Sequence, residues 1–413
     1  MKKILFLIVL LCSFIANSIW ATVAYRLEDF EKGGSRLNIG VIVINQKSYF
    51  KAGLSPDMKF GPFGLGFDLN MYIPTNSDDT VPTELSTFAF RMISYEHNDL
   101  WGVKWGRLTN VNFGYGLLME NYDSGSAGST EFTTEKAGFD IYYNPQPIKV
   151  RAMWTATNLK ALRGTYTLSE NVFLGRPLFL GVTYVTDSDG VFHSNSTTDN
   201  IRAAQTGISA DLSVPLLEKR ILSAYLEVAN LYEQGTGSAI GIGGYLGGSL
   251  NYRLEYRMLG KKFVPGYFNN TYEVNDRAAN AFNFATDAPN TETKGWLGYI
   301  GLSFFDDYFK TEWMLEDYDN TAPILSAAVG WSKFGPSVGV INYSKSFQNP
   351  DGGIVSASIL YENMVRIPMP TDFIFNIRRV YSNMSDFNDP NNYTESVTMT
   401  FRPNLRGIFP FLM

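Results

Sequence analysis

The sequence has almost no cysteine and almost no histidine. Cys12 is the single cysteine among 413 residues, and the only histidines are His97 and His193. A lone cysteine cannot form an intrachain disulfide. Hydrolases usually need a histidine as the base beside their nucleophile, and the pattern predicts His97 in a short turn and His193 in a long loop at opposite ends of the fold. We therefore predict that the protein is not an enzyme, has no catalytic residues and needs no cofactor.

Positive charge is also scarce. The chain carries 34 Lys and Arg against 40 Asp and Glu, a net charge of −6. Nucleic-acid binding needs clustered positive charge, so we expect no nucleic-acid partner. Charged residues make up only 18% of the sequence, whereas about a quarter is usual in soluble domains.

Long apolar runs are missing after residue 21, so no transmembrane helix is expected, since one needs about 20 apolar residues. The chain begins with Met1-Lys2-Lys3, and a short apolar run leads to Ala21. A basic start, a short apolar stretch and a small residue at the cut are typical of a secretory signal peptide. We predict a signal peptide over residues 1–21, with Cys12 inside it. Losing Lys2 and Lys3 leaves 32 basic residues against 40 acidic ones, a net charge of −8.

Two acidic stretches resemble parts of a calcium loop. They are residues 187–190, Asp-Ser-Asp-Gly, and residues 317–320, Asp-Tyr-Asp-Asn. Neither completes a twelve-residue calcium loop, and Asp and Gly are common in ordinary turns. We therefore predict no metal site.

What the sequence does contain is strict alternation. Residues 249–258 read Ser-Leu-Asn-Tyr-Arg-Leu-Glu-Tyr-Arg-Met, with large apolar residues at even positions and polar or charged ones at odd positions. A period of two is the pattern of a β-strand with one apolar and one polar face. Similar segments recur from Arg36 to Pro403, without a linker or a shift in composition. The parse gives 20 strands, and 16 or 18 remain compatible with it.

These segments predict an all-β protein made of a single antiparallel transmembrane β-barrel over residues 22–413. Within hydrocarbon every backbone amide must be paired, so a chain without apolar helices can span it only as a closed sheet. The predicted connections alternate between mostly short turns on one side and longer loops on the other, as in outer-membrane barrels. From Gly106 to Leu118 we expect either one bulged strand continuing from Trp101 or a second strand after a turn.

In this architecture the chain resembles bacterial outer-membrane porins, a resemblance of pattern that rests on no specific motif. It implies a location in the bacterial outer membrane, lipid and small polar solutes as partners, and a possible homo-oligomer. It also implies an outer-membrane pore for passive diffusion of small polar solutes or ions. Two alternatives remain: a loop-plugged barrel acting as an envelope anchor or adhesin, and a selective transporter of a hydrophobic substrate.

The charged residues on the predicted inner face are the candidate pore lining. Opposite charges on facing walls would create a transverse field in the pore, whereas charges that pair with their neighbours would only solvate the lumen. The candidates are Arg91, Lys104, Lys149, Arg151, Glu227, Arg253, Glu255, Arg257, Lys310, Glu312 and Glu316.

The longest irregular segment, Gly260 to Thr293, is the candidate constriction. It begins with an aromatic stretch around Phe263 and Tyr267 that could anchor it to the barrel wall. We expect it to be a solvent-exposed outer loop, with folding into the lumen as the alternative.

Overall fold

The computed structural model describes residues 36–403 except for short gaps in the connections. The gaps are 45–46, 77–87, 125–136, 174, 189–190, 194–199, 203–204, 218–220, 248, 270–271, 273–290, 306–307, 320–322, 335–336, 347–348, 366–370 and 382–392. The predicted signal peptide lies outside the described residues and stays a prediction. No helix in the described part is long and apolar enough to cross a bilayer.

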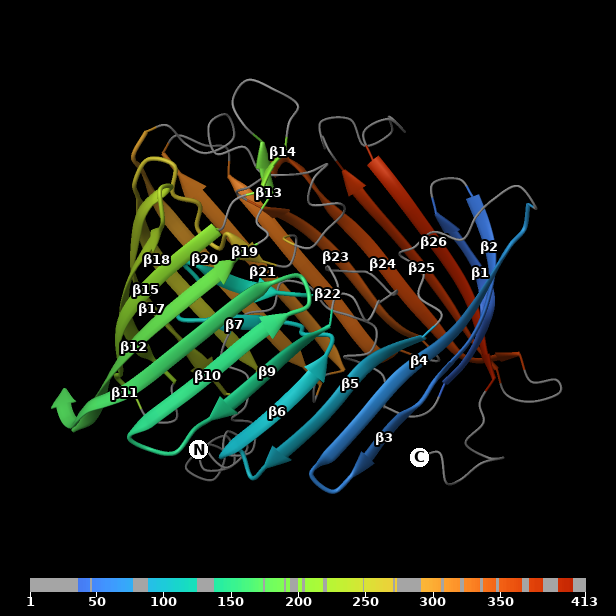
Figure 1. The fold of residues 1–413 in the computed structure, drawn as a ribbon, viewed down its shortest axis with the longest axis horizontal. Helices are drawn as coiled ribbons and strands as arrows, with labels where there is room; N and C mark the ends of the chain where they lie inside the picture. Colours follow the sequence, from blue (N-terminus) through green and yellow to red (C-terminus); the bar gives the residue numbers. More distant parts are fainter. Residues whose placement is uncertain are drawn as a thin grey trace, which may run out of the picture.

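The predicted fold class is confirmed, because the strands form one closed antiparallel barrel (Figure 1). Its strands are β1 (Arg36–Ile44), β2 (Lys47–Ser55), β3 (Asp57–Phe60), β4 (Phe63–Pro74), β5 (Phe88–His97), β6 (Trp101–Gly106), β9 (Gly138–Tyr143), β10 (Ile148–Thr155), β11 (Leu159–Phe173), β12 (Arg176–Asp187), β15 (Gln205–Pro215), β16 (Ser223–Leu231), β17 (Gly235–Leu246), β18 (Leu250–Leu259), β20 (Thr293–Phe304), β21 (Phe309–Tyr318), β22 (Ile324–Phe334), β23 (Ser337–Ser346), β24 (Asn349–Val365), β25 (Thr371–Tyr381) and β26 (Tyr393–Pro403). Closure comes from β1, which pairs with both β2 and β26.

The barrel has 20 spans because β2 and β3 are two parts of one span. Pro56 separates them, since proline has no N–H to donate to the ladder, and both parts pair with β4. The predicted count of 20 is therefore correct. Successive spans are neighbours in the sheet, so every barrel connection joins adjacent antiparallel strands.

The two ends of the barrel differ in their connections, as the sequence predicted. One end, here the short-turn end, carries brief turns such as residues 98–100 and 144–147. The other, the long-loop end, carries the longest connections, including residues 75–87 and 260–292.

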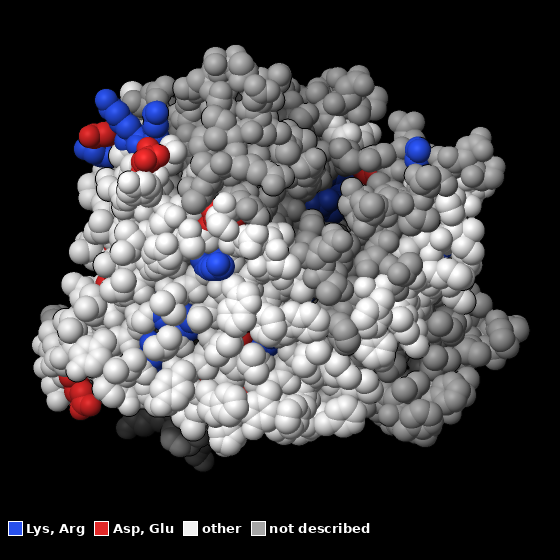
Figure 2. Space-filling view, viewed as in Figure 1, with Lys and Arg blue, Asp and Glu red and all other residues white. Residues whose placement is uncertain are grey.

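The outer wall is apolar. On β18 the outward Leu254 and Met258 are 46% and 42% exposed, whereas the inward Glu255 and Arg257 are fully buried. Figure 2 shows that the visible outer face over the strands is mostly uncharged, with charged side chains gathered mainly near one upper rim. This arrangement places lipid outside the barrel and polar groups inside it.

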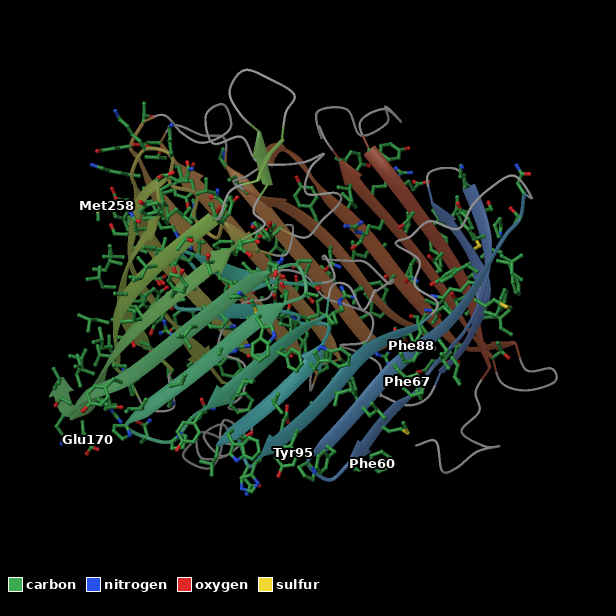
Figure 3. The ribbon with its side chains drawn as sticks, viewed as in Figure 1. Phe60, Phe67, Phe88, Tyr95, Glu170 and Met258 are labelled. Carbon is green, nitrogen blue, oxygen red and sulfur yellow. The ribbon has the colours of Figure 1, made fainter. Side chains whose placement is uncertain are left out.

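Aromatic side chains gather on the outer wall at the short-turn end. Phe63 packs edge to face with Tyr95 at 4.7 Å, and Tyr95 lies 4.9 Å from the ring of Trp101. Figure 3 shows Phe60 and Tyr95 near the ends of their strands. Such rings favour the headgroup zone of a membrane, which fits the rim of a spanning barrel.

Five short strands lie outside the barrel sheet. The strands β13 (Val191–His193) and β14 (Asn200–Arg202) form a small hairpin in the connection after β12. The strands β7 (Val111–Phe113), β8 (Met119–Tyr122) and β19 (Phe268–Asn269) form a three-stranded sheet inside the barrel (Figure 1). The prediction that residues 106–118 extend the wall is therefore wrong, and β6 pairs directly with β9.

Candidate functional site

The interior is organised by the segment Arg107 to Ser124, here called the inner hairpin. The chain leaves the wall at Gly106, whose φ is +128° and whose added Cβ would lie 2.3 Å from the carbonyl oxygen of Arg91. Only glycine fits this combination of backbone angle and close approach. Directly after it, the Arg107 guanidinium donates to both carboxylate oxygens of Asp123 at 3.1 and 3.0 Å. This buried pair closes the base of the inner hairpin.

The tip of the inner hairpin is held by a carboxylate of the wall. Glu227 on β16 is fully buried, and its Oε2 accepts the backbone N–H groups of Tyr115 and Leu117 at 3.2 and 3.1 Å. Its other oxygen accepts the Ser209 hydroxyl at 3.0 Å. The Tyr115 ring also stacks on Tyr225, with 3.8 Å between centroids. The tip is thereby fixed to β15 and β16.

A second contact fixes the inner hairpin to β18. Glu120 forms an ion pair with Arg253 and lies 3.7 Å from the Arg257 guanidinium. Arg253 also donates to the carbonyl oxygen of Tyr115 at 3.1 Å. Arg257 in turn bonds Glu255 at 2.6 Å and Glu316 at 2.8 Å. The network joins two guanidinium groups to three carboxylates, all of them buried, so each charge has a neighbour of opposite sign.

A second inner segment, residues 261–269, packs beside the inner hairpin. Gly266 and Phe268 donate their N–H groups to the carbonyl oxygens of Leu117 and Leu118 at 2.9 and 3.0 Å. Phe263 and Phe268 are fully buried. The expectation that residues 260–293 form a solvent-exposed loop is therefore wrong for this described part.

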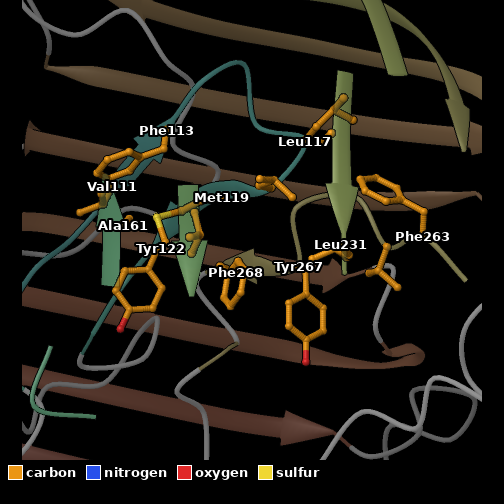
Figure 4. Packing of buried hydrophobic residues seen from close by; sticks show 14 of the residues in the cluster. Val111, Phe113, Leu117, Met119, Tyr122, Ala161, Leu231, Phe263, Tyr267 and Phe268 are labelled. Atoms are coloured by element: carbon orange, nitrogen blue, oxygen red, sulfur yellow. The ribbon is translucent and has the colours of Figure 1, made fainter. Parts of the chain in front are cut away.

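The two inner segments share an apolar cluster with the wall near the long-loop end. Figure 4 shows the side chains of Phe113, Leu117, Phe263 and Phe268 packed together with Leu231 of β16. Burial of large apolar side chains stabilises by about 1.5–3 kcal/mol each, so the cluster contributes substantially to docking of both segments. Sequence reasoning missed it because Val111 and Phe113 alternate just as a wall strand does.

A cavity of about 610 Å³, here called the chamber, lies on the side of the inner hairpin that faces away from the apolar cluster. Its lining includes Asp99 and Asn144 from short turns, and Asn112 and Tyr115 from the inner hairpin. The chamber therefore lies between the inner hairpin and the short-turn end. Its walls come from β5, from β9 to β12, from β15 to β18 and from β20.

The eleven predicted lining residues all belong to barrel strands and take inward positions. Five of them meet through the contacts of the inner hairpin: Glu227, Arg253, Glu255, Arg257 and Glu316. Lys149, Arg151 and Arg253 line the chamber. The remaining four are Arg91 on β5, Lys104 on β6, and Lys310 and Glu312, which both lie on β21. The Arg91 guanidinium lies 3.6 Å from the Asp68 carboxylate. Their role in lining a pore stays a prediction.

Several charged residues of the interior were not predicted. Arg163 and Asp211 pair at 2.6 Å, and Asp140 pairs with Arg151 at 2.7 Å. Arg163 shares its parity with Thr165 and Thr167, so the alternation of β11 could have revealed it. Glu120 gave no such signal, because it belongs to no wall strand. Arg163 of β11 and Asp211 of β15 pair across the intervening strand β12, and Arg257 of β18 and Glu316 of β21 pair across β20. Which of the two arrangements governs the lumen stays a prediction.

The histidines lie at opposite ends of the barrel. His97 ends β5 at the short-turn end, whereas His193 ends β13 beyond the long-loop end (Figure 1). The stretch Gly335-Pro336-Ser337-Val338-Gly339 matches the Gly-x-Ser-x-Gly pattern, but Ser337 begins β23 of a hairpin rather than a strand-to-helix turn. Its hydroxyl accepts a hydrogen bond from the Trp331 indole at 3.3 Å. Within the described residues no group of three metal-ligating side chains occurs.

A closed barrel with an apolar outer wall and charged residues inside defines a transmembrane β-barrel, and the protein is located in the bacterial outer membrane. No family model and no curated protein matches the chain.

Solved structures with a similar fold are outer-membrane proteins. One is Wzi of Escherichia coli, described as a carbohydrate-binding β-barrel involved in capsule assembly, at 10% identity over 89% of this chain and 84% of that one, with a TM-score of 0.37. A BenF-like porin of Pseudomonas fluorescens Pf-5 has 10% identity, coverage of 91% and 99%, and a TM-score of 0.38. OprD of Pseudomonas aeruginosa has 10% identity, coverage of 94% and 97%, and a TM-score of 0.35. Similarity at this level concerns the barrel architecture and carries no argument about function.

Proposed function

We propose that the protein is a constricted outer-membrane pore for passive diffusion of small polar solutes or ions. The observation that carries this proposal is the charged interior of a 20-span barrel, which contains a chamber of about 610 Å³. A barrel of 16 or more strands is too wide for its own side chains to fill. The inner segments narrow this space, so the expected pore is much smaller than the barrel.

The orientation follows from the connections. Outer-membrane barrels have short periplasmic turns and longer outer loops. The short-turn end and the chamber would then face the periplasm. The apolar cluster, near the long-loop end, would face the cell exterior. Outer-membrane lipid would contact the apolar outer wall around Leu254. That the protein forms a homo-oligomer stays a prediction.

A second candidate is a barrel plugged by its own chain, serving as an envelope anchor or adhesin. The observation that favours it is the firm attachment of the inner hairpin through Glu227 and Glu120. A plug fixed by buried charges opens only at a high energetic cost, because each broken pair leaves an uncompensated buried charge. The selective transporter of a hydrophobic substrate has less support, since the chamber wall carries several cations.

Single-channel recording separates these candidates. The full-length protein is refolded, checked for its closed barrel by heat-modifiable migration, and inserted into a planar bilayer. Stable conductance steps are expected from a pore. A folded barrel that inserts without producing steps would overturn the pore proposal and favour the plugged barrel.

A further inference from the structure

Two arginines face the chamber from directly opposite positions on neighbouring strands. Arg151 on β10 is the register partner of Arg163 on β11, and both line the chamber. Like charges opposite each other weaken a sheet. Lys149 precedes Arg151 by two residues on the same face and also lines the chamber. These three cations on one face of the chamber wall point to a negatively charged ligand.

The carboxylates that pair with these arginines lie on their outer sides. Asp140 on β9 bonds Arg151 at 2.9 and 2.7 Å, and Asp211 on β15 bonds Arg163 at 2.6 and 3.0 Å. In both pairs the arginine side chain is more exposed, 34% against 14% and 17% against 1%. Neither carboxylate lines the chamber. The aspartates therefore orient the guanidinium groups and leave these groups, rather than themselves, facing the cavity.

The wall is built to accommodate this arrangement. Gly181 lies opposite Thr165 and Asp211 in the register, and a Cβ there would be 2.4 Å from both the Arg163 guanidinium and the Asp211 carboxylate. A glycine at this position makes room for the ion pair. Among the described lining residues the carboxylates that do reach the chamber are Glu96 and Asp99, both exposed near the short-turn end.

The rest of the lining combines rings with neutral hydrogen-bonding groups. An aromatic ring comes from Tyr142, and amides and hydroxyls come from Asn112, Asn251, Thr165 and Ser213. Aromatic rings pack against the C–H faces of sugar rings, while amides and hydroxyls bond their hydroxyl groups. The volume of about 610 Å³ is in the range of small-molecule sites, about 300–1,000 Å³.

We propose that the chamber binds an anionic sugar, with its phosphate or carboxylate group between Arg151 and Arg163. Arginine presents several N–H donors in a plane, which matches either anionic group. The inference deepens the proposed pore function and rests on it for the route by which the ligand enters. Binding itself requires no conduction, so the two proposals can fail separately.

The test is isothermal titration calorimetry on the full-length barrel in detergent micelles. The probes are glucose 6-phosphate, glucuronate, glucose and inorganic phosphate. At least one of the two anionic sugars is expected to bind ten or more times more tightly than both glucose and phosphate, and the stronger of them identifies the anionic group. Equal affinity for glucose, or no binding of either anionic sugar, would overturn the inference.

Three variants locate the binding site. R151Q and R163Q are expected to weaken binding of the anionic sugar at least tenfold. R379Q is the matched control, because Arg379 takes the outward parity of β25 and pairs with Glu395. T165Y adds bulk beside Lys149 without removing a charge, so it tests the site even where an arginine variant does not fold. Unchanged binding in T165Y and the folded arginine variants would contradict the location.

Conduction separates this inference from the pore proposal. A barrel that binds glucose 6-phosphate but gives no conductance steps would overturn the pore and retain the site. A barrel that conducts but binds neither anionic sugar would retain the pore and overturn the site.

Discussion

The carboxylate of Glu227 on β16 accepts the backbone N–H of Leu117, 110 residues away in the sequence, at 3.1 Å. The same oxygen accepts the N–H of Tyr115. A wall residue thus supplies the hydrogen bonds that the tip of the inner hairpin cannot make within itself. An unpaired buried N–H costs about 1–3 kcal/mol, so this contact decides whether the tip stays docked.

Glu227→Ala is therefore expected to release the tip. Loss of two hydrogen bonds to a charged acceptor, about 1.5–3 kcal/mol each, should speed amide hydrogen exchange of residues 114–118 at least tenfold. Mass spectrometry of the exchanged protein in micelles measures this rate. Glu170→Ala, at an exposed position of β11, serves as the control and should leave the rate unchanged. Equal protection in both variants would show that Glu227 does not hold the tip.

Glu120→Gln is expected to destabilise the interior, because it removes the buried ion pair between the inner hairpin and Arg253 of β18. Breaking a buried ion pair costs about 3–5 kcal/mol. Glu395→Gln removes the carboxylate of the partly exposed pair with Arg379, where about 0–1 kcal/mol is expected. Urea denaturation in the presence of lipid compares the two variants. A loss in Glu120→Gln no larger than that in Glu395→Gln would contradict the buried network.

Gly106→Ala should impair folding more than Gly61→Ala. Both glycines have positive φ, +128° at Gly106 and +58° at Gly61. A Cβ added at Gly106 would clash with the backbone of Arg91, whereas a Cβ added at Gly61 would have no other atom within 4 Å. The turn at Gly61 is also in the left-handed region, which a non-glycine residue can adopt at about 1–2 kcal/mol. The yield of heat-modifiable barrel after refolding measures the difference. Similar yields would mean that the wall adjusts at the exit of the inner hairpin.

Leu254→Arg tests the lipid face. Leu254 lies in the middle of β18 and is 46% exposed, so an arginine there should cost about 2–4 kcal/mol in a bilayer. Leu246→Arg is the control, since Leu246 ends β17 near the short-turn end, where about 0–1 kcal/mol is expected. Equilibrium folding into lipid vesicles gives both values. Equal free-energy costs for the two variants would contradict the prediction that Leu254 lies at the bilayer midplane and Leu246 near its surface.

Reversal of Lys149 and Arg151 to Glu should shift ion selectivity toward cations, because both line the chamber. The reversal potential under a salt gradient measures this shift. Arg379→Glu changes the charge outside the lumen and should leave the potential as it is. An unchanged potential in the double variant would show that the chamber lies off the conducting route.

The sequence alone determined the barrel wall. The alternation in residues 249–258 predicted the strand observed as Leu250–Leu259, with Leu254 outside and Glu255 inside. The span count followed in the same way, because the period of two is a local property of the extended backbone. Gly61-Pro62 and Asn144-Pro145 lie in two of the short turns, where glycine and proline are common.

Only the tertiary structure decided what lies inside. Val111 and Phe113 alternate as a wall strand would, yet they pair with β8 within the barrel. Glu120 and Arg253 are 133 residues apart, and no local pattern links them. The position of the inner hairpin depends on contacts with strands far along the chain, including Glu227 and Arg253. Local periodicity encodes which face a strand residue takes, whereas docking inside the barrel depends on contacts that exist only after the wall has closed.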